Sequence, residues 1–303
     1  MTIGELLDLA GAPKPMCQRC RLPISLPTRN DGLGKCPNRL CRRAWDFKIF
    51  PRARSKINLL NQILIAKLFI MNESSARACQ LLDVQEDALR EAFRNIREAL
   101  GRHQKNIQEN IRWPRGAVCE ADETQFKSRN RVKKSGKKRY YCDVWIGVIG
   151  RGSRDGYLKR IGTRSTLSKK RFPKLPAKCW VKLWGTSIRP KTHGRVTLCT
   201  DGNQMYRRGE GYDHYWVCHQ KKEFWKKHKE TKLQVGAQVI DSWRHQLKSQ
   251  MPRQTKSTAW TEGHVWCASY LHSTAGGDEA DKIRAAVRII RSYFGEGGTS
   301  GGE

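Results

Sequence analysis

Four cysteines within the first 41 residues constrain the fold of this chain more than any other feature of its sequence. They form two close pairs, Cys17-x2-Cys20 and Cys36-x4-Cys41, joined by an arm rich in Pro, Gly and Asn. Each short pair can wrap a tight turn around one ion, and thiolates at such spacings are typical ligands of tetrahedral zinc. The pattern predicts a zinc-ribbon-like module over residues 1–50; the alternative is four reduced cysteines without a shared ion.

The charge balance indicates what kind of partner the chain binds. It has 59 Lys and Arg against 28 Asp and Glu, a net charge of +31. Such a surface gathers phosphates and releases their counterions, so double-stranded DNA is the expected partner and an anionic membrane surface the second choice. The most apolar run, LLNQILIAKLFIM, is interrupted by Asn61, Gln62 and Lys67, so we expect no membrane span.

The first residues, MTIGELLDLAGAPKP, lack the basic start and the long apolar stretch of a secretory signal. Metal binding by the cysteines therefore fits better than disulfides, because the expected compartment is reducing. We expect the nucleus if the host is eukaryotic, and the cytoplasm or nucleoid if it is bacterial.

Residues 51–112 are predicted to form three helices. The first carries apolar residues at helical spacing, namely Leu60, Ile63, Leu64 and Leu68. Ser74 or Ser75 can cap a second helix that runs through Leu82. A three-residue turn precedes the third helix, whose apolar face is Leu89, Ala92, Phe93, Ile96 and Leu100. This succession resembles a helix-turn-helix.

Three arginines lie on the third helix opposite its apolar face. Arg90, Arg94 and Arg97 follow one another at i, i+4 and i+7, where a recognition helix would meet the major groove of DNA. The alternative is a solvated basic face on a helical linker. The net charge of the chain favours DNA contact.

From Ala117 the pattern changes to strands, which read GAVCEAD, YYCDVWIGVIG, YLKRIG and RVTLCTD. The basic segment KSRNRVKKSGKKR is predicted to be a turn between the first two. Its lysines, which are Lys133, Lys134, Lys137 and Lys138, are candidate DNA contacts, with a solvated loop as the alternative. We assign an α/β catalytic domain to 113–272, and a C-terminal helix with a low-complexity tail to 273–303.

Three carboxylates are candidate ligands of a divalent cation. Asp122 is expected at the end of the first strand, Asp201 at the end of a later one, and Asp241 on a helix from Gln238 to about Met251. Lys248 lies two turns after Asp241 on the same helical line. Carboxylates brought together repel one another, so such a cluster indicates bound Mg²⁺, with Mn²⁺ as a substitute.

Several neighbours of these acids are predicted to have ordinary roles. Glu120 and Glu123 flank Asp122 and are expected at the solvated surface, and strand alternation directs Glu123 to the opposite face from Asp122. Glu230 and Gln238 rank below Asp241 as the third ligand. Four tryptophans are expected in the core rather than stacked on flipped bases: Trp225, Trp243, Trp260 and Trp266.

The order of these features resembles the DDE-type transposases of zinc-ribbon bacterial insertion sequences and their eukaryotic Merlin-type relatives. The resemblance covers about residues 15 to 272 and rests on the cysteines, the helix-turn-helix, EADET, TDG and the helix around VIDSW. It implies an RNase H-like domain, a mixed sheet flanked by helices, and metal-dependent strand cleavage and transfer at terminal inverted repeats by a homo-oligomer.

Site residues follow from the resemblance by position. Asp122 would be the first catalytic acid, Asp201 the second, and Lys248 the basic residue after the third. Asp241 falls where the family usually has Glu, one methylene longer. This departure favours one alternative, a catalytically silent DNA-binding protein, which the presence of all three acids opposes. A second alternative is a nuclease of the same fold without strand transfer.

Overall fold

The computed structural model describes residues 16–17, 19–25, 33–41, 44–46, 49, 57, 59–132, 138–166, 175–218, 221–251, 258–274 and 276–295. It divides into two compact units. The first contains residues 1–103 and 274–303, and the second contains residues 104–273. The four domain ranges expected from the sequence stay predictions.

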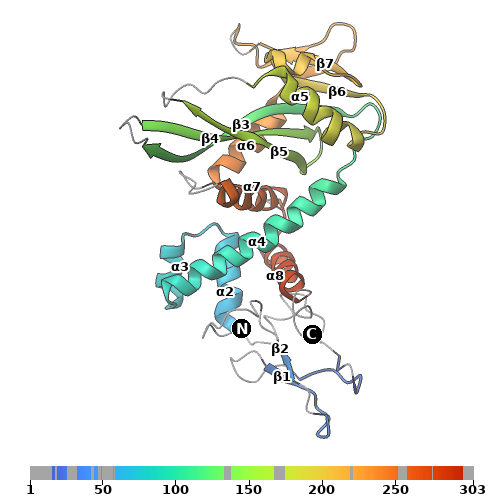
Figure 1. The fold of residues 1–303 in the computed structure, drawn as a ribbon. Helices are drawn as coiled ribbons and strands as arrows, with labels where there is room; N and C mark the ends of the chain where they lie inside the picture. The colour runs from blue at the N-terminus through green and yellow to red at the C-terminus, as the bar shows by residue number, and fades with distance from the viewer. Residues whose placement is uncertain are drawn as a thin grey trace. The chain divides into compact units, whose positions relative to one another are not determined.

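The first unit contains a small sheet and a group of helices (Figure 1). β1 (Leu33–Lys35) pairs antiparallel with β2 (Ala44–Asp46). The helices are α2 (Leu59–Ile70), α3 (Ser75–Leu82), the first part of α4 (Glu86–Asn110) and α8 (Glu279–Gly295). Lys67 on α2 pairs with Glu279 on α8 at 3.0 Å, so the C-terminal helix packs within this unit.

Local sequence signals account for α3 and α4. The Ser74 hydroxyl accepts a hydrogen bond from the Arg77 amide at 3.2 Å, which caps α3 as predicted. Asp83 ends α3 in the left-handed conformation, with φ 49°. The apolar face predicted for α4 is confirmed, because all five of its residues are buried: Leu89, Ala92, Phe93, Ile96 and Leu100.

The buried face of α2 differs from the prediction. Ile63 is buried as expected, but the rest of the buried face is Gln62, Ile65, Ala66 and Phe69. Phe69 packs edge-on against Phe93, with ring centroids 5.1 Å apart. Gln62 is buried because its side chain accepts from the Ile49 amide and donates to the Ile57 carbonyl. These hydrogen bonds set the orientation of α2, and the spacing of apolar residues in the sequence does not reveal them.

The second unit is built on a five-stranded mixed sheet with the order β5-β4-β3-β6-β7. The strands are β3 (Val118–Val132), β4 (Lys138–Gly150), β5 (Gly156–Thr166), β6 (Val196–Asp201) and β7 (Tyr212–Val217). The first three pair antiparallel, β6 runs parallel to β3, and β7 runs parallel to β6. The expected mixed α/β sheet is confirmed.

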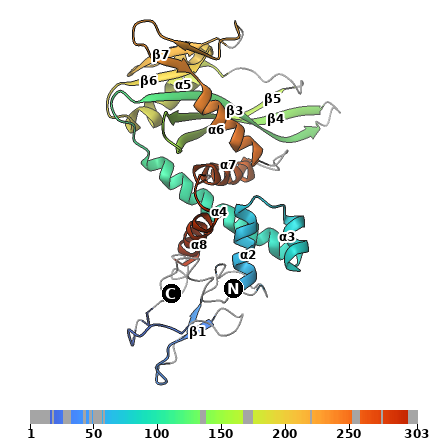
Figure 2. The same cartoon turned by 180° about the vertical axis from the view of Figure 1, so that it is seen from behind.

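Helices flank both faces of this sheet (Figures 1 and 2). One face carries α6 (Gln238–Ser249) and α7 (Thr258–Ser273). The other carries α5 (Ala177–Leu183), the π-helical turn η1 (Trp184–Ile188) and the 3-10 turn η3 (Gln204–Arg207), with η2 (Arg189–Lys191) following η1. A two-stranded sheet, β8 (Trp225–Lys227) with β9 (Gln234–Gly236), precedes α6.

Strands β3 and β4 are longer than predicted. The segment expected to be a turn continues the ladder, with Arg131 opposite Arg139 and Val132 opposite Lys138. Basic residues of this segment therefore belong to paired strands, where the charge pattern alone suggests a turn. Lys138 is the first residue of β4, whereas Lys133, Lys134 and Lys137 lie outside the described residues.

Close packing fixes α6 against the sheet. Trp243 is buried among the apolar residues of α6, α7 and the sheet. Its ring lies on Gly147 and Gly156, where an added Cβ would come within 2.8 Å and 2.7 Å of ring atoms. Any larger residue at these two positions would push α6 away from the sheet. Within the described part of the chain, no helix has the length and apolar character needed to cross a membrane.

Candidate metal centres

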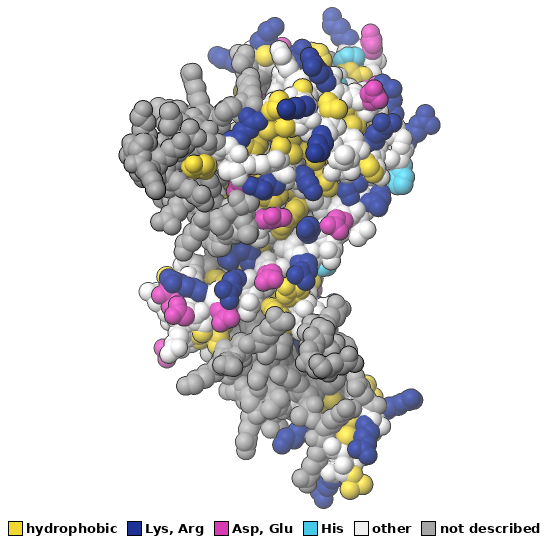
Figure 3. Space-filling model, in the orientation of Figure 1, with side chains coloured by type: hydrophobic (Ala, Val, Ile, Leu, Met, Phe, Trp, Pro, Cys, Tyr) yellow, Lys and Arg dark blue, Asp and Glu magenta, His cyan; other side chains and the backbone are white. Residues whose placement is uncertain are grey.

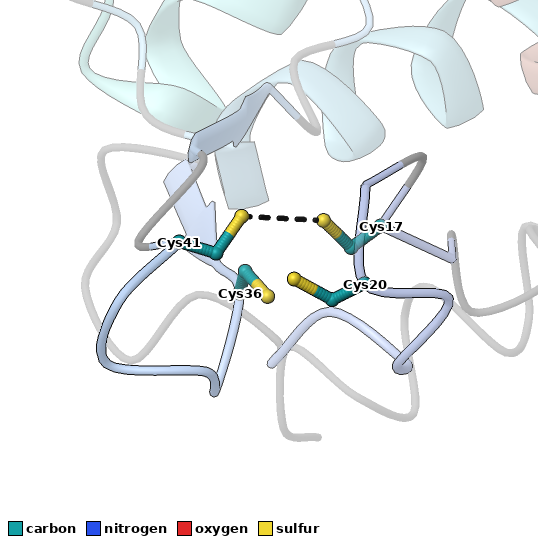
Figure 4. Close-up of side chains that lie close together, drawn as sticks. All are labelled: Cys17, Cys20, Cys36 and Cys41. Atoms are coloured by element: carbon teal, nitrogen blue, oxygen red, sulfur yellow. Dashed lines mark hydrogen bonds between the residues drawn. The ribbon is translucent and has the colours of Figure 1, made fainter.

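The four N-terminal cysteines converge as the sequence predicts. Their sulfur atoms all lie within 4.8 Å of one another, and the Cys17 and Cys41 sulfurs are 3.7 Å apart. Figure 4 shows two loops directing the four side chains toward a common point. Cys17 and Cys36 are buried, while Cys20 and Cys41 are partly exposed.

Tight turns bring the cysteines together. The Cys17 amide donates to the Leu22 carbonyl at 2.9 Å, and the Cys41 amide donates to the Asn38 carbonyl at 3.0 Å. The Asn38 side chain also donates to the Cys20 sulfur at 3.4 Å. Cys17 and Cys20 thus lie in one hydrogen-bonded turn, and Cys41 ends a second turn that begins at Asn38, two residues after Cys36.

The thiols differ in acidity. The Cys20 amide lowers the pKa of Cys17 to about 6. The hydrogen bond to Cys41 and burial raise the pKa of Cys20 to about 12. Four thiolates this close need a cation to be ionised together, and four sulfur ligands suit Zn²⁺. The cluster is a candidate zinc site.

The second unit brings Asp122 and Asp201 to the same level of the sheet. Ala121 on β3 is paired with Thr200 on β6, and the two aspartates are the next residues of these parallel strands, which are spaced about 4.8 Å apart. Asp201 ends β6 as predicted. Asp122 is not at a strand end, because β3 continues to Val132; it lies where the pairing with β6 stops.

Asp241 is brought to the same place by α6. It lies in the first turn of that helix, and its carboxylate accepts a hydrogen bond from Arg244 Nη2 at 2.8 Å. Arg244 Nη1 donates to Asp122 Oδ2 and to the Glu123 carbonyl. One guanidinium therefore joins the carboxylates of β3 and α6.

The charges of the three acids act on one another. Burial raises the pKa of Asp122 to about 7, and the negative charges of Asp201 and Asp241 add to this effect, while Arg244 opposes it. Arg244 pairs with Asp122 and Asp241, and Asp201 adds a third negative charge nearby, which leaves excess negative charge and oxygen donors. This donor set fits Mg²⁺ or Mn²⁺.

The acids lie farther apart than the cysteines. Among the described residues, only the four cysteines form a group of three or more potential ligands close enough to share one ion. Arg244 lies between Asp122 and Asp241 instead. The sequence analysis missed this residue, although its position three residues after Asp241 on the same helix was a usable signal.

Glu120 is not at the surface, contrary to the prediction. Its side chain is 1% exposed and pairs with Arg151 at 2.8 Å. Its other oxygen accepts from the amides of Val239 and Ile240 at 2.8 and 3.1 Å. Glu120 thus ties the start of α6 to β3, two residues before Asp122, and so positions Asp241 for the site.

The other side of β3 carries a second polar contact. Glu123 is half-buried and accepts from the Asn203 side chain at 2.5 Å. The backbone N–H of Asn203 in turn donates to the Asp201 carboxylate at 3.1 Å. The turn after β6 is therefore held to β3, which fixes the position of Asp201.

The remaining predicted residues lie apart from the acids or outside the described set. Lys248 is exposed near the end of α6. On α4, Arg90 pairs with Glu86 at 2.6 Å and Arg94 with Glu91 at 3.4 Å, both at the surface. Arg97 instead lies over the Phe69 ring, 5.7 Å from its centroid. Their DNA contacts stay predictions.

Comparisons with known proteins give little guidance. No protein-family model matches the chain, and no curated protein matches it. One similar solved structure is the crystal structure of the Mos1 strand transfer complex, at 9% identity over 78% of this chain and 76% of that chain, with a TM-score of 0.23. A second, a pre-cleavage Mos1 transpososome, has 8% identity over 82% and 83%, with a TM-score of 0.21. At these TM-scores the likeness carries no argument about this chain.

Proposed function

We propose that this chain is a DDE-type transposase that binds terminal inverted repeats and catalyses metal-dependent cleavage and transfer of DNA strands. The observation that carries the proposal is one guanidinium, Arg244, that pairs with carboxylates of two elements, Asp122 on β3 and Asp241 on α6. A third carboxylate, Asp201 on β6, is near enough for its charge to act on Asp122. The sequence motifs that contain these acids, and the mixed sheet flanked by helices, support it.

In this proposal the three aspartates hold the divalent cations. When bound, these ions supply activation of the attacking oxygen and stabilisation of the leaving oxygen. In cleavage, a water oxygen attacks phosphorus and the 3′ oxygen leaves with a proton. In joining, that 3′ hydroxyl attacks a target phosphodiester, whose own 3′ oxygen leaves. Lys248 supplies positive charge for a DNA phosphate.

DNA binding is assigned to the first unit and to the net charge. The cysteine module and the pair α3–α4, read as a helix-turn-helix, would contact the repeats, with Arg90 and Arg94 exposed for this purpose. Two ends of an element must be handled together, so a homo-oligomer is part of the proposal. The face of the second unit drawn in Figure 3 carries many more Lys and Arg than Asp and Glu side chains.

One structural observation favours the alternative of a silent DNA-binding protein. Arg244 already neutralises Asp122 and Asp241, and Asp241 reaches less far than Glu would. In that case the acids would be a structural ion-pair cluster. A nuclease would differ from a transposase only in its products.

The test is an assay of cleavage and joining on a DNA fragment carrying the repeats that flank the coding sequence. The full zinc-loaded chain is compared with Asp122→Asn, Asp201→Asn and Asp241→Asn in Mg²⁺ or Mn²⁺. Asp213→Asn, an exposed partner of Arg195, is the matched control. We expect joined strands from the native and control chains, and at least 1,000-fold less product from the three variants, about 4 kcal/mol of transition-state stabilisation.

Other outcomes identify the alternatives. Nicks without joined strands would indicate a nuclease. Intact DNA with retained binding would indicate the silent protein. An Asp241→Glu variant that gains activity would show that the shorter side chain limits catalysis.

A further inference from the structure

The segment from Lys221 to Lys232 exposes large aromatic side chains among cations. It reads KKEFWKKHKETK, with six lysines and two glutamates. Phe224 is 59% exposed and Trp225 57% exposed. The core position expected for Trp225 is wrong, because β8 is a three-residue strand that pairs with β9 and is exposed throughout.

The Trp225 ring has open space around it. Its strand partner is Gly236, which presents no side chain beside the indole. The Trp225 side chain is more than half exposed to solvent. Lys227 lies two residues on and so projects from the same face of β8. This outer face, made of the exposed Trp225 and Lys227, is called the β8 face below.

The opposite face of β8 is fixed to the main sheet. Val235, opposite Lys226, is buried with Cys199 and Val217. The Lys226 ammonium lies 5.7 Å from the centre of the Trp216 ring, and the Arg207 guanidinium lies 4.6 Å from it. The β8 face is therefore held on a rigid support with positive charge at its rim.

The β8 face is close along the chain to the acids. β9 ends at Gly236, and Asp241 follows five residues later, a span of at most about 18 Å. Trp216 is opposite Thr200, the residue before Asp201. DNA bound at the acids would thus pass near the β8 face.

We propose that the β8 face binds unpaired nucleotides of single-stranded DNA, by stacking of a base on Trp225 and contact of a phosphate with Lys227. That these nucleotides flank the reacting phosphodiester rests on the proposed function. A base offers its flat face only when it is unpaired, and base-to-aromatic stacking contributes about 1–3 kcal/mol per base.

A membrane surface fits the same side chains less well. Insertion into lipid needs a continuous apolar face. Here successive residues of β8 alternate between faces, so that lysines are interleaved with the aromatic ring. One aromatic ring beside one cation matches one base and its neighbouring phosphate.

The experiment measures binding of a fluorescent oligo(dT) strand and of a blunt duplex of equal length by the full zinc-loaded chain in magnesium-free buffer. We expect Trp225→Ala to weaken single-strand binding about 5- to 150-fold, from the stacking free energy, and to change duplex binding less than about 2-fold. Trp225→Phe should restore most of the loss. Val181→Ala, which shortens an exposed apolar residue on α5, should leave both affinities unchanged.

Lys227→Ala tests the phosphate contact. It should reduce the slope of log affinity against log salt concentration by about 0.7 for the single strand. Equal loss on strand and duplex with Trp225→Ala, or no loss, would overturn the proposal. So would phosphatidylserine vesicles that bind the native chain and release it on Trp225→Ala while oligo(dT) binding is unchanged.

This test is independent of catalysis. A chain that never cuts DNA can still bind oligo(dT) without metal. In that case the proposed function is wrong and the proposal for the β8 face is supported. If DNA is cut and joined but Trp225→Ala binds oligo(dT) normally, the β8 face fails alone.

Discussion

The cysteine cluster and the acid cluster are both candidate metal centres, but they compensate their charge in different ways. The cysteine sulfurs lie within 4.8 Å of one another, and the hydrogen bonds described for them come from amides and from one another. Two of the three acids, Asp122 and Asp241, are already joined by Arg244. A site whose charge is compensated by the chain itself can be empty and folded, so its ion can exchange.

The two clusters also differ in their support. The cysteines are on short turns beside two three-residue strands. The acids are on β3, β6 and α6, whose position is fixed by Trp243 against Gly147 and Gly156. We infer that zinc folds the first site, whereas the second site is folded before its metal binds.

Zinc removal should have the largest effect. A zinc chelator, or Cys36→Ser, should unfold the module around the cysteines, because metal binding there contributes on the order of 10 kcal/mol. Protease protection of residues 16–46 measures this. Cys79→Ser, in a partly exposed cysteine of α3, is the control and should keep the protection. If the module stayed protected from protease without zinc, zinc would not be needed to fold it, and the two sites would not differ in this respect.

Loss of the Arg244 guanidinium should have the next largest effect. Arg244→Gln leaves Asp122 and Asp241 without their cation and should lower the free energy of unfolding by about 3 kcal/mol in magnesium-free buffer. Urea denaturation measures it. Arg195→Gln, which removes an exposed pair with Asp213, should cost at most about 1 kcal/mol. Mg²⁺ should recover more stability in Arg244→Gln than in the native chain, and equal recovery would contradict the compensating role.

The pH dependence of stability should show the smallest of these effects. The pKa of Asp122 is raised to about 7 in the folded chain and is near 4 when unfolded. The contribution of this carboxyl to the free energy of unfolding is therefore fully present below about pH 4 and is lost as pH rises through 7. About 2 kcal/mol of it is lost between pH 5.5 and 8. Urea denaturation without Mg²⁺ should show this loss, and Asp122→Asn should abolish it. If the free energy of unfolding of Asp122→Asn falls with pH as steeply as that of the native chain, another group causes the pH dependence.

Periodic and local signals predicted much of the fold. The stripe from Leu89 to Leu100 and the Ser74 cap are confirmed, because helical spacing and capping act within a few residues. The cysteine cluster is equally predictable from the sequence, since the two cysteines of each pair are close neighbours along the chain. The order of strands and helices follows from the same local patterns.

Long-range contacts could not be predicted in this way. Glu120 is buried because it meets Arg151 and the start of α6, the latter about 120 residues away. Trp225 is exposed because its strand pairs with β9 in a small sheet outside the five-stranded one, which its apolar character does not reveal. Asp122 was assigned to a strand end, whereas its position is set by where β6 stops pairing with β3.

Binding of Mn²⁺ to the zinc-loaded chain at pH 8, followed by calorimetric titration, tests the central claim most directly. We expect saturable binding in the native chain, its loss in Asp122→Asn and in Asp201→Asn, and tighter binding in Arg244→Gln, where no guanidinium competes for the carboxylates. Asp213→Asn should bind like the native chain. Native binding that is absent, or that survives both Asp122→Asn and Asp201→Asn, would contradict an exchangeable metal site at the acids.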